Sequence, residues 1–182
     1  MSSLAPALLL SMPQLVDPNF HKSVVLLCEH ATEGAFGLVV NRPSDISAAE
    51  AVRLEPPLIN PNDLPLLIGG PVEPQRGWIL TARAPEQEEH RGLGAGLYLS
   101  ASPLLLRRVL TARPLPKRTL VLAGYAGWRP GQLDTEIAES SWLIMPVELD
   151  LIFEIPAAAS WEMAIRRLGA DPHLLQQGHG VH

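Results

Sequence analysis

Three polar side chains in this sequence have the chemistry of general acid–base catalysis. His30 closes an apolar run, and Asp134 and Glu136 follow a glycine-rich segment in the second half of the chain. A histidine beside carboxylates can accept and return protons near neutral pH, so the three residues would suit a small-molecule hydrolase. This alternative hypothesis requires them to meet in one cleft, and a separation beyond about 10 Å would exclude it. For His30 alone, a structural histidine with hydrogen bonds is the favoured interpretation.

Cys28 and His30 form a second candidate pair, because an imidazole can activate a thiol by accepting its proton. The two residues are two positions apart at the end of an apolar run, so in a regular strand their side chains share one face. Same-face neighbours on a strand are about 6.5–7 Å apart, which is too far for good proton transfer. A cysteine within an apolar run is usually packed in the core, so a structural thiol is favoured over a nucleophile.

The leading hypothesis is a non-enzymatic binding or regulatory protein, because no nucleophile–base–orienter set is recognisable. Its surface would be built from the segments Asn41–Pro43, Gly69–Val72 and Tyr125–Glu136. The candidate binding residues in these segments are Asn41, Arg42, Gly69, Gly70, Tyr125, Trp128 and Gln132. Aromatic faces beside convergent polar groups are typical of a binding cleft. The alternative for the last segment is a connection whose aromatic rings close the core.

Arg42 is the charged member of this proposed surface. Pro43 holds it extended, so its guanidinium could receive a carboxylate or phosphate from a ligand. An internal ion pair with Asp17, Asp45 or Glu136 is favoured. Alanine at Arg42 and Trp128 should abolish ligand capture without lowering the melting temperature if the surface binds a ligand. If both variants unfold, the surface is structural.

Other motifs give no support for a cofactor or a metal. The segment Gly69–Pro71 lacks the ending of a phosphate loop, and Gly92-x-Gly94-x-Gly96 precedes a strand rather than a helix, so both are predicted to be turns. His173, His179 and His182 have no metal-ligand spacing. We expect neither a cofactor nor a metal site.

Composition limits the class of partner and the compartment. The net charge of −5 argues against direct nucleic-acid binding, which usually needs a basic face. One cysteine excludes an intrachain disulfide, and the N-terminal segment lacks the basic start of a secretory signal and the length of a membrane span. These features predict a cytoplasmic protein with no membrane contact, whose partner is a small molecule or another protein.

Short apolar runs bounded by turn signals predict a strand-rich chain. The expected strands are 7–11, 23–29, 36–41, 66–69, 78–81, 97–100, 119–123 and 142–145. Helices are expected from Ser47, from Ser102, after Gly131 and over 161–168. Strands and helices do not alternate, so we predict an α+β fold of mixed or antiparallel sheets with about four peripheral helices. Residues 1–175 should form one domain, and 176–182 a flexible tail.

Several segments together resemble the YqgE/AlgH family, a group of bacterial proteins of undefined biochemical function. The matching segments are Met12-Pro13, Asp17–Phe20, Ser23-Val24, Cys28–His30, Gly34–Gly37, Asn41–Pro43, Gly69–Val72, Arg76–Leu80, Gly124–Leu133, Glu136 and Trp142. They occur in family order over nearly the whole chain. Two positions depart from the family pattern: Thr81 stands where members commonly carry histidine, and Ser100–Pro103 replaces a Thr-Ser-x-Asp stretch.

The resemblance implies a fold of strongly coiled, partly bifurcated sheets with peripheral helices. Some members are labelled transcriptional regulators of exopolysaccharide production, which implies a regulatory role. The family supplies no established catalytic residues.

Overall fold

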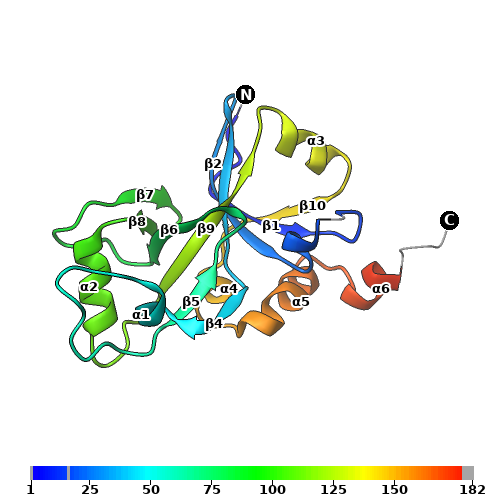
Figure 1. Ribbon diagram of the computed structural model, residues 1–182. Helices are drawn as coiled ribbons and strands as arrows, with labels where there is room; N and C mark the ends of the chain where they lie inside the picture. The colour runs from blue at the N-terminus through cyan, green and yellow to red at the C-terminus, as the bar shows by residue number, and fades with distance from the viewer. Residues whose placement is uncertain (1, 16, 178–182) are drawn as a thin grey trace.

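The computed structural model describes residues 2–15 and 17–177. Its centre is a ten-stranded, strongly curled sheet with helices at its periphery (Figure 1). The strands are β1 (Ala7–Ser11), β2 (Val24–Ala31), β3 (Gly34–Val39), β4 (Pro43–Ser47), β5 (Pro65–Ile68), β6 (Val72–Thr81), β7 (Arg91–Gly94), β8 (Leu97–Ser100), β9 (Thr119–Trp128) and β10 (Trp142–Met145). The helices are η1 (Pro18–Phe20), α1 (Ala48–Ala51), α2 (Pro103–Thr111), α3 (Gln132–Ala138), α4 (Leu149–Phe153), α5 (Ala157–Arg167) and α6 (Pro172–Gln177).

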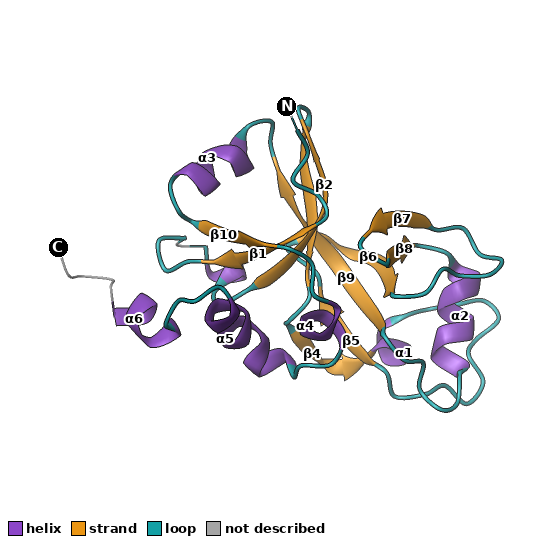
Figure 2. Ribbon diagram, turned by 180° about the vertical axis from the view of Figure 1, so that it is seen from behind, coloured by secondary structure: helices purple, strands orange, loops and turns teal. Residues whose placement is uncertain are grey.

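Strand β9 is where the sheet forks. Its first half, residues 119–123, pairs with β6 on one side and with β5, in parallel, on the other. Its second half, residues 126–128, pairs with β3, which continues the sheet through β2 and β1 to β10. Figure 2 shows the two arms diverging from β9, with α1 and α2 beside one arm and α3 and α5 beside the other. Tyr125 lies at the fork, because it pairs with Val72 of β6 and adjoins Ala126, where the pairing with β3 begins.

Three clusters of buried side chains fill the curl. The largest packs Leu26, Leu38 and Leu122 against α4 and α5. The second joins Val25 and Trp142 to Leu133 of α3, and the third packs Ile79 and Val121 against α2. The strands alternate between clusters, because successive side chains of a strand point to opposite faces.

The α+β class and the curled, mostly antiparallel sheet confirm the sequence prediction. The four expected helices appear as α1, α2, α3 and α5, and a turn at residues 32–33 joins β2 and β3 as a hairpin. Strands β4 and β7, and helices α4 and α6, were not predicted. Of the expected tail, Gln176 and Gln177 end α6, and 178–182 lie outside the described residues.

One correction concerns Gly124–Trp128, which was expected to begin a connection. These residues instead extend β9, and the connection to α3 shrinks to residues 129–131. Pairing of Tyr125 with β6 and of residues 126–128 with β3 explains why this glycine-containing segment remains a strand. Within the described part of the chain, every helix falls short of the length and apolar character that crossing a lipid bilayer demands.

Candidate functional site

His30 and Asp134, which the sequence proposes as acid–base partners, are in contact. His30 Nε2 lies 3.1 Å from Asp134 Oδ1. On the other side of the ring, the Leu4 backbone N–H donates to Nδ1 at 3.1 Å. Nδ1 is therefore the acceptor, and Nε2 carries the proton that it donates to Asp134. With both ring nitrogens engaged and the side chain buried, His30 fastens the N-terminal segment and α3 to β2.

Glu136, the third candidate, turns away from this pair and holds two indoles. Its Oε1 accepts from Trp128 Nε1 at 3.1 Å and from Trp142 Nε1 at 2.9 Å. Its Oε2 accepts from Gln132 Nε2 at 3.0 Å. Asp134 and Glu136 diverge because residues two apart on a helix face different directions. We call Trp128, Gln132, Glu136 and Trp142 the Glu136 cluster.

The two tryptophans of the Glu136 cluster are core residues. Trp128 is 6% exposed and Trp142 is 2% exposed. Their rings meet edge to face with centroids 5.9 Å apart, and Phe20 packs on Trp142 in the same manner. The structure therefore favours the core-closing interpretation for Trp128 and Gln132.

Cys28 does not face His30. The pairing of β2 with β3 shifts register between Leu27 and Glu29, so a bulge interrupts the alternation of side chains at Cys28. Cys28 packs in the largest core cluster, whereas His30 bonds to α3. Burial raises the pKa of the Cys28 thiol to about 12, which keeps it protonated and unreactive near neutral pH.

Asn41 and Arg42 hold the loop that carries η1. Asn41 accepts from Val24 N and donates to Lys22 O, each at 2.9 Å. The Arg42 guanidinium donates to the carbonyls of Asn19 and His21 and to the Ser23 hydroxyl. The expected internal role of Arg42 thus has carbonyl and hydroxyl partners in place of Asp17, Asp45 or Glu136.

Gly69 and Gly70 lie where two backbones cross at the fork. A Cβ on Gly69 would lie 2.4 Å from the Gly124 carbonyl oxygen, and one on Gly70 would lie 2.2 Å from Tyr125 backbone atoms. Gly69 also bridges the arms, since its N–H donates to Ala123 and its carbonyl accepts from Val39. These glycines permit the crossing, as close backbone approach requires.

The residues of the binding surface proposed from the sequence consequently lie in separate parts of the molecule. Trp128 pairs with Ala35 near the start of β3, whereas Arg42 follows the end of β3, roughly 20 Å along the strand direction. Most of its members make hydrogen bonds or close packing contacts inside the molecule. Tyr125 differs, because it lines an open pocket.

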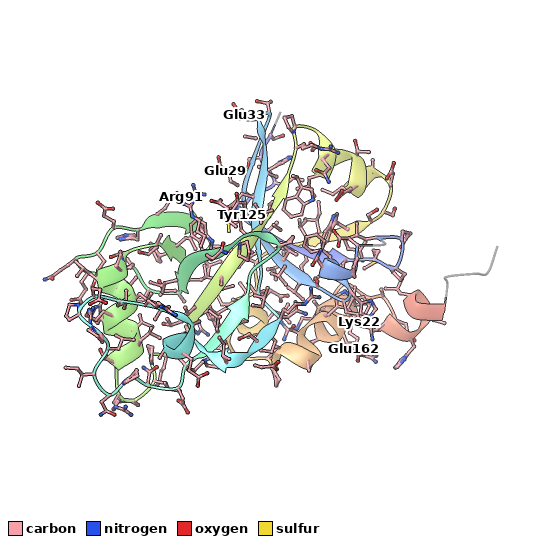
Figure 3. The ribbon with its side chains drawn as sticks, in the orientation of Figure 1. Lys22, Glu29, Glu33, Arg91, Tyr125 and Glu162 are labelled. Carbon is pink, nitrogen blue, oxygen red and sulfur yellow. The ribbon has the colours of Figure 1, made fainter. Side chains whose placement is uncertain are left out.

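This aromatic pocket has a volume of about 420 Å³ and lies at the fork of the sheet. Its lining consists of Glu29, Phe36, Arg76, Trp78, Arg91, Leu99, Ser100, Ala101 and Tyr125. The ring of Phe36 lies 5.2 Å from that of Trp78 and 5.1 Å from that of Tyr125, so three rings form a continuous apolar wall. In Figure 3, Glu29, Arg91 and Tyr125 are grouped near the middle of the molecule.

Charged side chains surround the rings. Arg76 lies over the Trp78 ring, with Cζ 4.5 Å from the centroid. Arg91 lies 3.3 Å from Glu29, and Arg76 lies 3.8 Å from Glu73, with all four side chains about half exposed. A hydrogen bond with Glu73 is the main reason that the pKa of Tyr125 is raised. Exposed pairs at such distances are weak and can be replaced by a ligand.

The indole of Trp78 has an unusual status among the four tryptophans. Trp128 and Trp142 donate to Glu136, and Trp161 donates to the Ser11 carbonyl at 3.0 Å. Among the described residues, Trp78 Nε1 is the buried side-chain nitrogen or oxygen atom that has no partner. A buried donor without a partner costs free energy, so an acceptor bound at this atom would be favourable.

Strand irregularities position the pocket residues. The β2 bulge places Glu29 opposite Phe36, and the pairing of β6 with β9 is interrupted between Val72 and Gly77. The interruption makes residues 73–76 an exposed excursion that carries Glu73 and Arg76. Bulges are common beside binding sites because they redirect side chains.

Most residues of this pocket were not predicted from the sequence. Phe36, Trp78, Arg76 and Arg91 come from three different strands, and no local spacing links them. The available signal was Arg76-Gly77-Trp78, in which a strand alternation places arginine and tryptophan on one face.

Metal ligation finds no geometric support in the described residues. Within 2–15 and 17–177, no group of three or more histidine, cysteine, aspartate or glutamate side chains is placed to hold an ion. His173 lies in α6, and His179 and His182 lie outside the described residues.

Comparisons with known proteins identify the family. The sequence model of the AlgH-like family matches residues 8–173. A UPF0301 protein of Anaeromyxobacter dehalogenans is 43% identical over 180 residues, covering 94% of this chain and 91% of that protein. A UPF0301 protein of Myxococcus xanthus is 41% identical over 183 residues, covering 100% of this chain and 99% of that protein.

Solved structures agree in fold. The solution structure of the AlgH protein from Pseudomonas aeruginosa matches with a TM-score of 0.79 and 32% identity, covering 100% of this chain and 98% of that one. A crystal structure of a Corynebacterium diphtheriae protein matches with a TM-score of 0.70 and 25% identity, covering 94% and 89%. The chain therefore belongs to the AlgH-like family, as its sequence motifs predict.

Proposed function

We propose that this protein is a non-enzymatic binding protein whose ligand site is the aromatic pocket at the fork of the sheet. The observation that carries the proposal is that Trp78, whose buried N–H has no partner among the described residues, lines an open pocket. A volume of about 420 Å³ is within the usual range for small-molecule sites. Tyr125 is retained from the surface proposed on sequence, whereas the other members of that surface contribute to the structure around it.

The contacts of the acid–base candidates support this proposal over the hydrolase alternative. A general base needs a nitrogen or carboxylate oxygen free to take a proton from the substrate. Both nitrogens of His30 have protein partners, and both oxygens of Glu136 accept hydrogen bonds from side chains. Neither residue lines the aromatic pocket.

A regulatory protein needs a ligand-sensing or partner-sensing surface, so the regulatory hypothesis is kept within this proposal. Binding at the fork would act on both arms of the sheet, because Tyr125 pairs with β6 and adjoins the residues of β9 that pair with β3. We place this activity in the cytoplasm, in keeping with a sequence that has one cysteine and therefore no intrachain disulfide.

A thermal-shift screen against a metabolite and nucleotide library tests the proposal, with hits repeated on Trp78→Phe. This variant keeps an aromatic ring and removes the unpartnered N–H, so it should fold with little loss of stability and weaken binding about tenfold.

Trp161→Phe is the matched control, because it removes an indole N–H that bonds to Ser11 outside the pocket. It should lower the melting temperature and leave ligand affinity unchanged. Hits that bind equally to wild type and Trp78→Phe, or a library without any hit, would contradict the proposed site.

A further inference from the structure

We infer that the aromatic pocket selects a planar ligand carrying an anionic acceptor group of the carboxylate type. The inference rests on the proposed function and adds the chemical class of the ligand. It depends on which hydrogen-bonding groups in the pocket are unused, which rings are already covered and which charges can be released.

The unused polar group of the pocket is a donor. Trp78 Nε1 can only donate, and it is buried without a partner among the described residues. The Ser100 hydroxyl already donates to the Glu89 carbonyl at 2.6 Å, and the neighbouring Glu73 raises the pKa of Tyr125. A ligand that completes this pocket must therefore bring an acceptor to the indole.

The two arginines strengthen the preference for an acceptor with negative charge. Arg76 and Arg91 reach the pocket from β6 and β7, and each pairs with a half-exposed carboxylate at 3.3 Å or more. A guanidinium can bind a carboxylate through two parallel hydrogen bonds, which is stronger than a loose single contact. A ligand carboxylate at the rim would therefore be met by cationic donors from two strands.

A cationic ligand is the competing interpretation, because three aromatic rings and two glutamates also resemble a cage for an ammonium group. In this pocket the Arg76 guanidinium already occupies the position over the Trp78 ring where a ligand cation would bind. The Arg76 guanidinium lies 4.5 Å from the Trp78 centroid, so a second cation on this ring would be repelled by it. The orphan indole N–H would also remain unpaired beside a cation.

The preference for a planar ligand follows from the aromatic side chains that line the pocket. Phe36, Trp78 and Tyr125 present ring surfaces whose centroids are 5.1–6.3 Å apart, and Leu99 adds an aliphatic contact. The three rings therefore pack against one another and form one aromatic wall, against which the ring of a flat ligand can stack or meet edge to face.

Calorimetric titration with three naphthalene derivatives of one shape tests the charge preference. The probes are naphthoate, neutral naphthamide and cationic aminomethylnaphthalene, each titrated into wild type, Arg91→Gln and Glu29→Gln. Naphthoate should bind at least about tenfold more tightly than the amide, and Arg91→Gln should weaken naphthoate by about tenfold. Glu29→Gln should strengthen naphthoate binding about threefold, because it frees Arg91 from its partner.

Arg118→Gln is the control for net charge, because Arg118 pairs with Glu154 and does not line this pocket. It should leave all three affinities unchanged. Tighter binding of the amine with both variant effects reversed would overturn the inference in favour of a cation cage. Equal binding of the amide, or no binding of naphthoate while library hits bind through Trp78, would also overturn it. A different result contradicts the proposed site itself, namely that no compound binds more weakly to Trp78→Phe than to wild type.

Discussion

The molecule contains two aromatic sites that look alike in sequence and differ in how their polar groups are used. In the Glu136 cluster, two indole N–H groups and one amide converge on a carboxylate that accepts all three. In the aromatic pocket, the Trp78 N–H is buried without a partner in the described part of the chain, and the arginines pair with exposed carboxylates at 3.3 Å or more. A satisfied network makes a rigid core, whereas an unsatisfied donor in an open pocket indicates binding.

The difference teaches that aromatic and acidic composition alone does not locate a binding site. Trp128, Gln132 and Glu136 form the most conspicuous aromatic and polar group in the sequence, and the structure uses them to attach α3 to the sheet. The pocket residues are dispersed over β2, β3, β6, β7, β8 and β9 and meet only through the fold.

Removing the shared acceptor of the Glu136 cluster should give the largest loss of stability. Glu136→Ala leaves two indole N–H groups and the Gln132 amide without their acceptor, which should lower the free energy of unfolding by about 3 kcal/mol or more. Chemical denaturation measures this change. Glu139→Ala is the control, since Glu139 is exposed at the end of α3, and its effect should stay within about 0.5 kcal/mol. Similar values for both variants would show that the Glu136 cluster is not structural.

Replacing single tryptophans should also distinguish the two sites, with smaller losses of stability than Glu136→Ala. Trp161→Phe loses a buried hydrogen bond to Ser11 and some core volume, so it should cost about 2 kcal/mol. Trp78→Phe loses no hydrogen bond within the described residues, so it should cost less than about 1 kcal/mol. Urea unfolding of both variants checks the difference, and a larger cost at Trp78 would contradict the assignment of its N–H as unpaired.

Arg42→Ala should give the smallest of these effects, roughly 1.5 kcal/mol, because its half-exposed guanidinium binds the 19–23 loop. Arg53→Ala, at an exposed arginine, should change stability by less than about 0.5 kcal/mol. Thermal unfolding compares the two. Loss of ligand affinity in Arg42→Ala without loss of stability would restore Arg42 to the binding surface.

Much of the fold follows from local sequence, because apolar runs between turn residues specify strands regardless of their partners. β1, β8 and β10 have the predicted bounds, and Ser102-Pro103 begins α2 as expected. β4 and β7 were missed because their residues are mostly polar or glycine, and pairing with a neighbour decides their conformation. The extension of β9 to Trp128 likewise depends on β3.

The sites were less predictable than the fold. The sequence suggests His30 and Asp134 as acid–base partners, and the structure places them in contact. It also shows that the Leu4 N–H occupies the second nitrogen of His30. The shared face of Cys28 and His30 was wrong because a bulge at Cys28, invisible in the sequence pattern, breaks the alternation. Which donors are left unpaired depends on every neighbouring group in the folded chain, so the status of Trp78 could not be predicted from sequence.

The most direct measurement is the indole N–H region of the NMR spectrum of protein labelled with nitrogen-15 at its four tryptophans, recorded while naphthoate is added. Trp78→Phe and Trp161→Phe assign two of the signals. We predict that the Trp78 signal moves downfield and saturates, because its N–H gains an acceptor, while the signals of Trp128, Trp142 and Trp161 keep their positions. A stationary Trp78 signal with shifts at Trp128 or Trp142 would place binding at the Glu136 cluster and contradict the account.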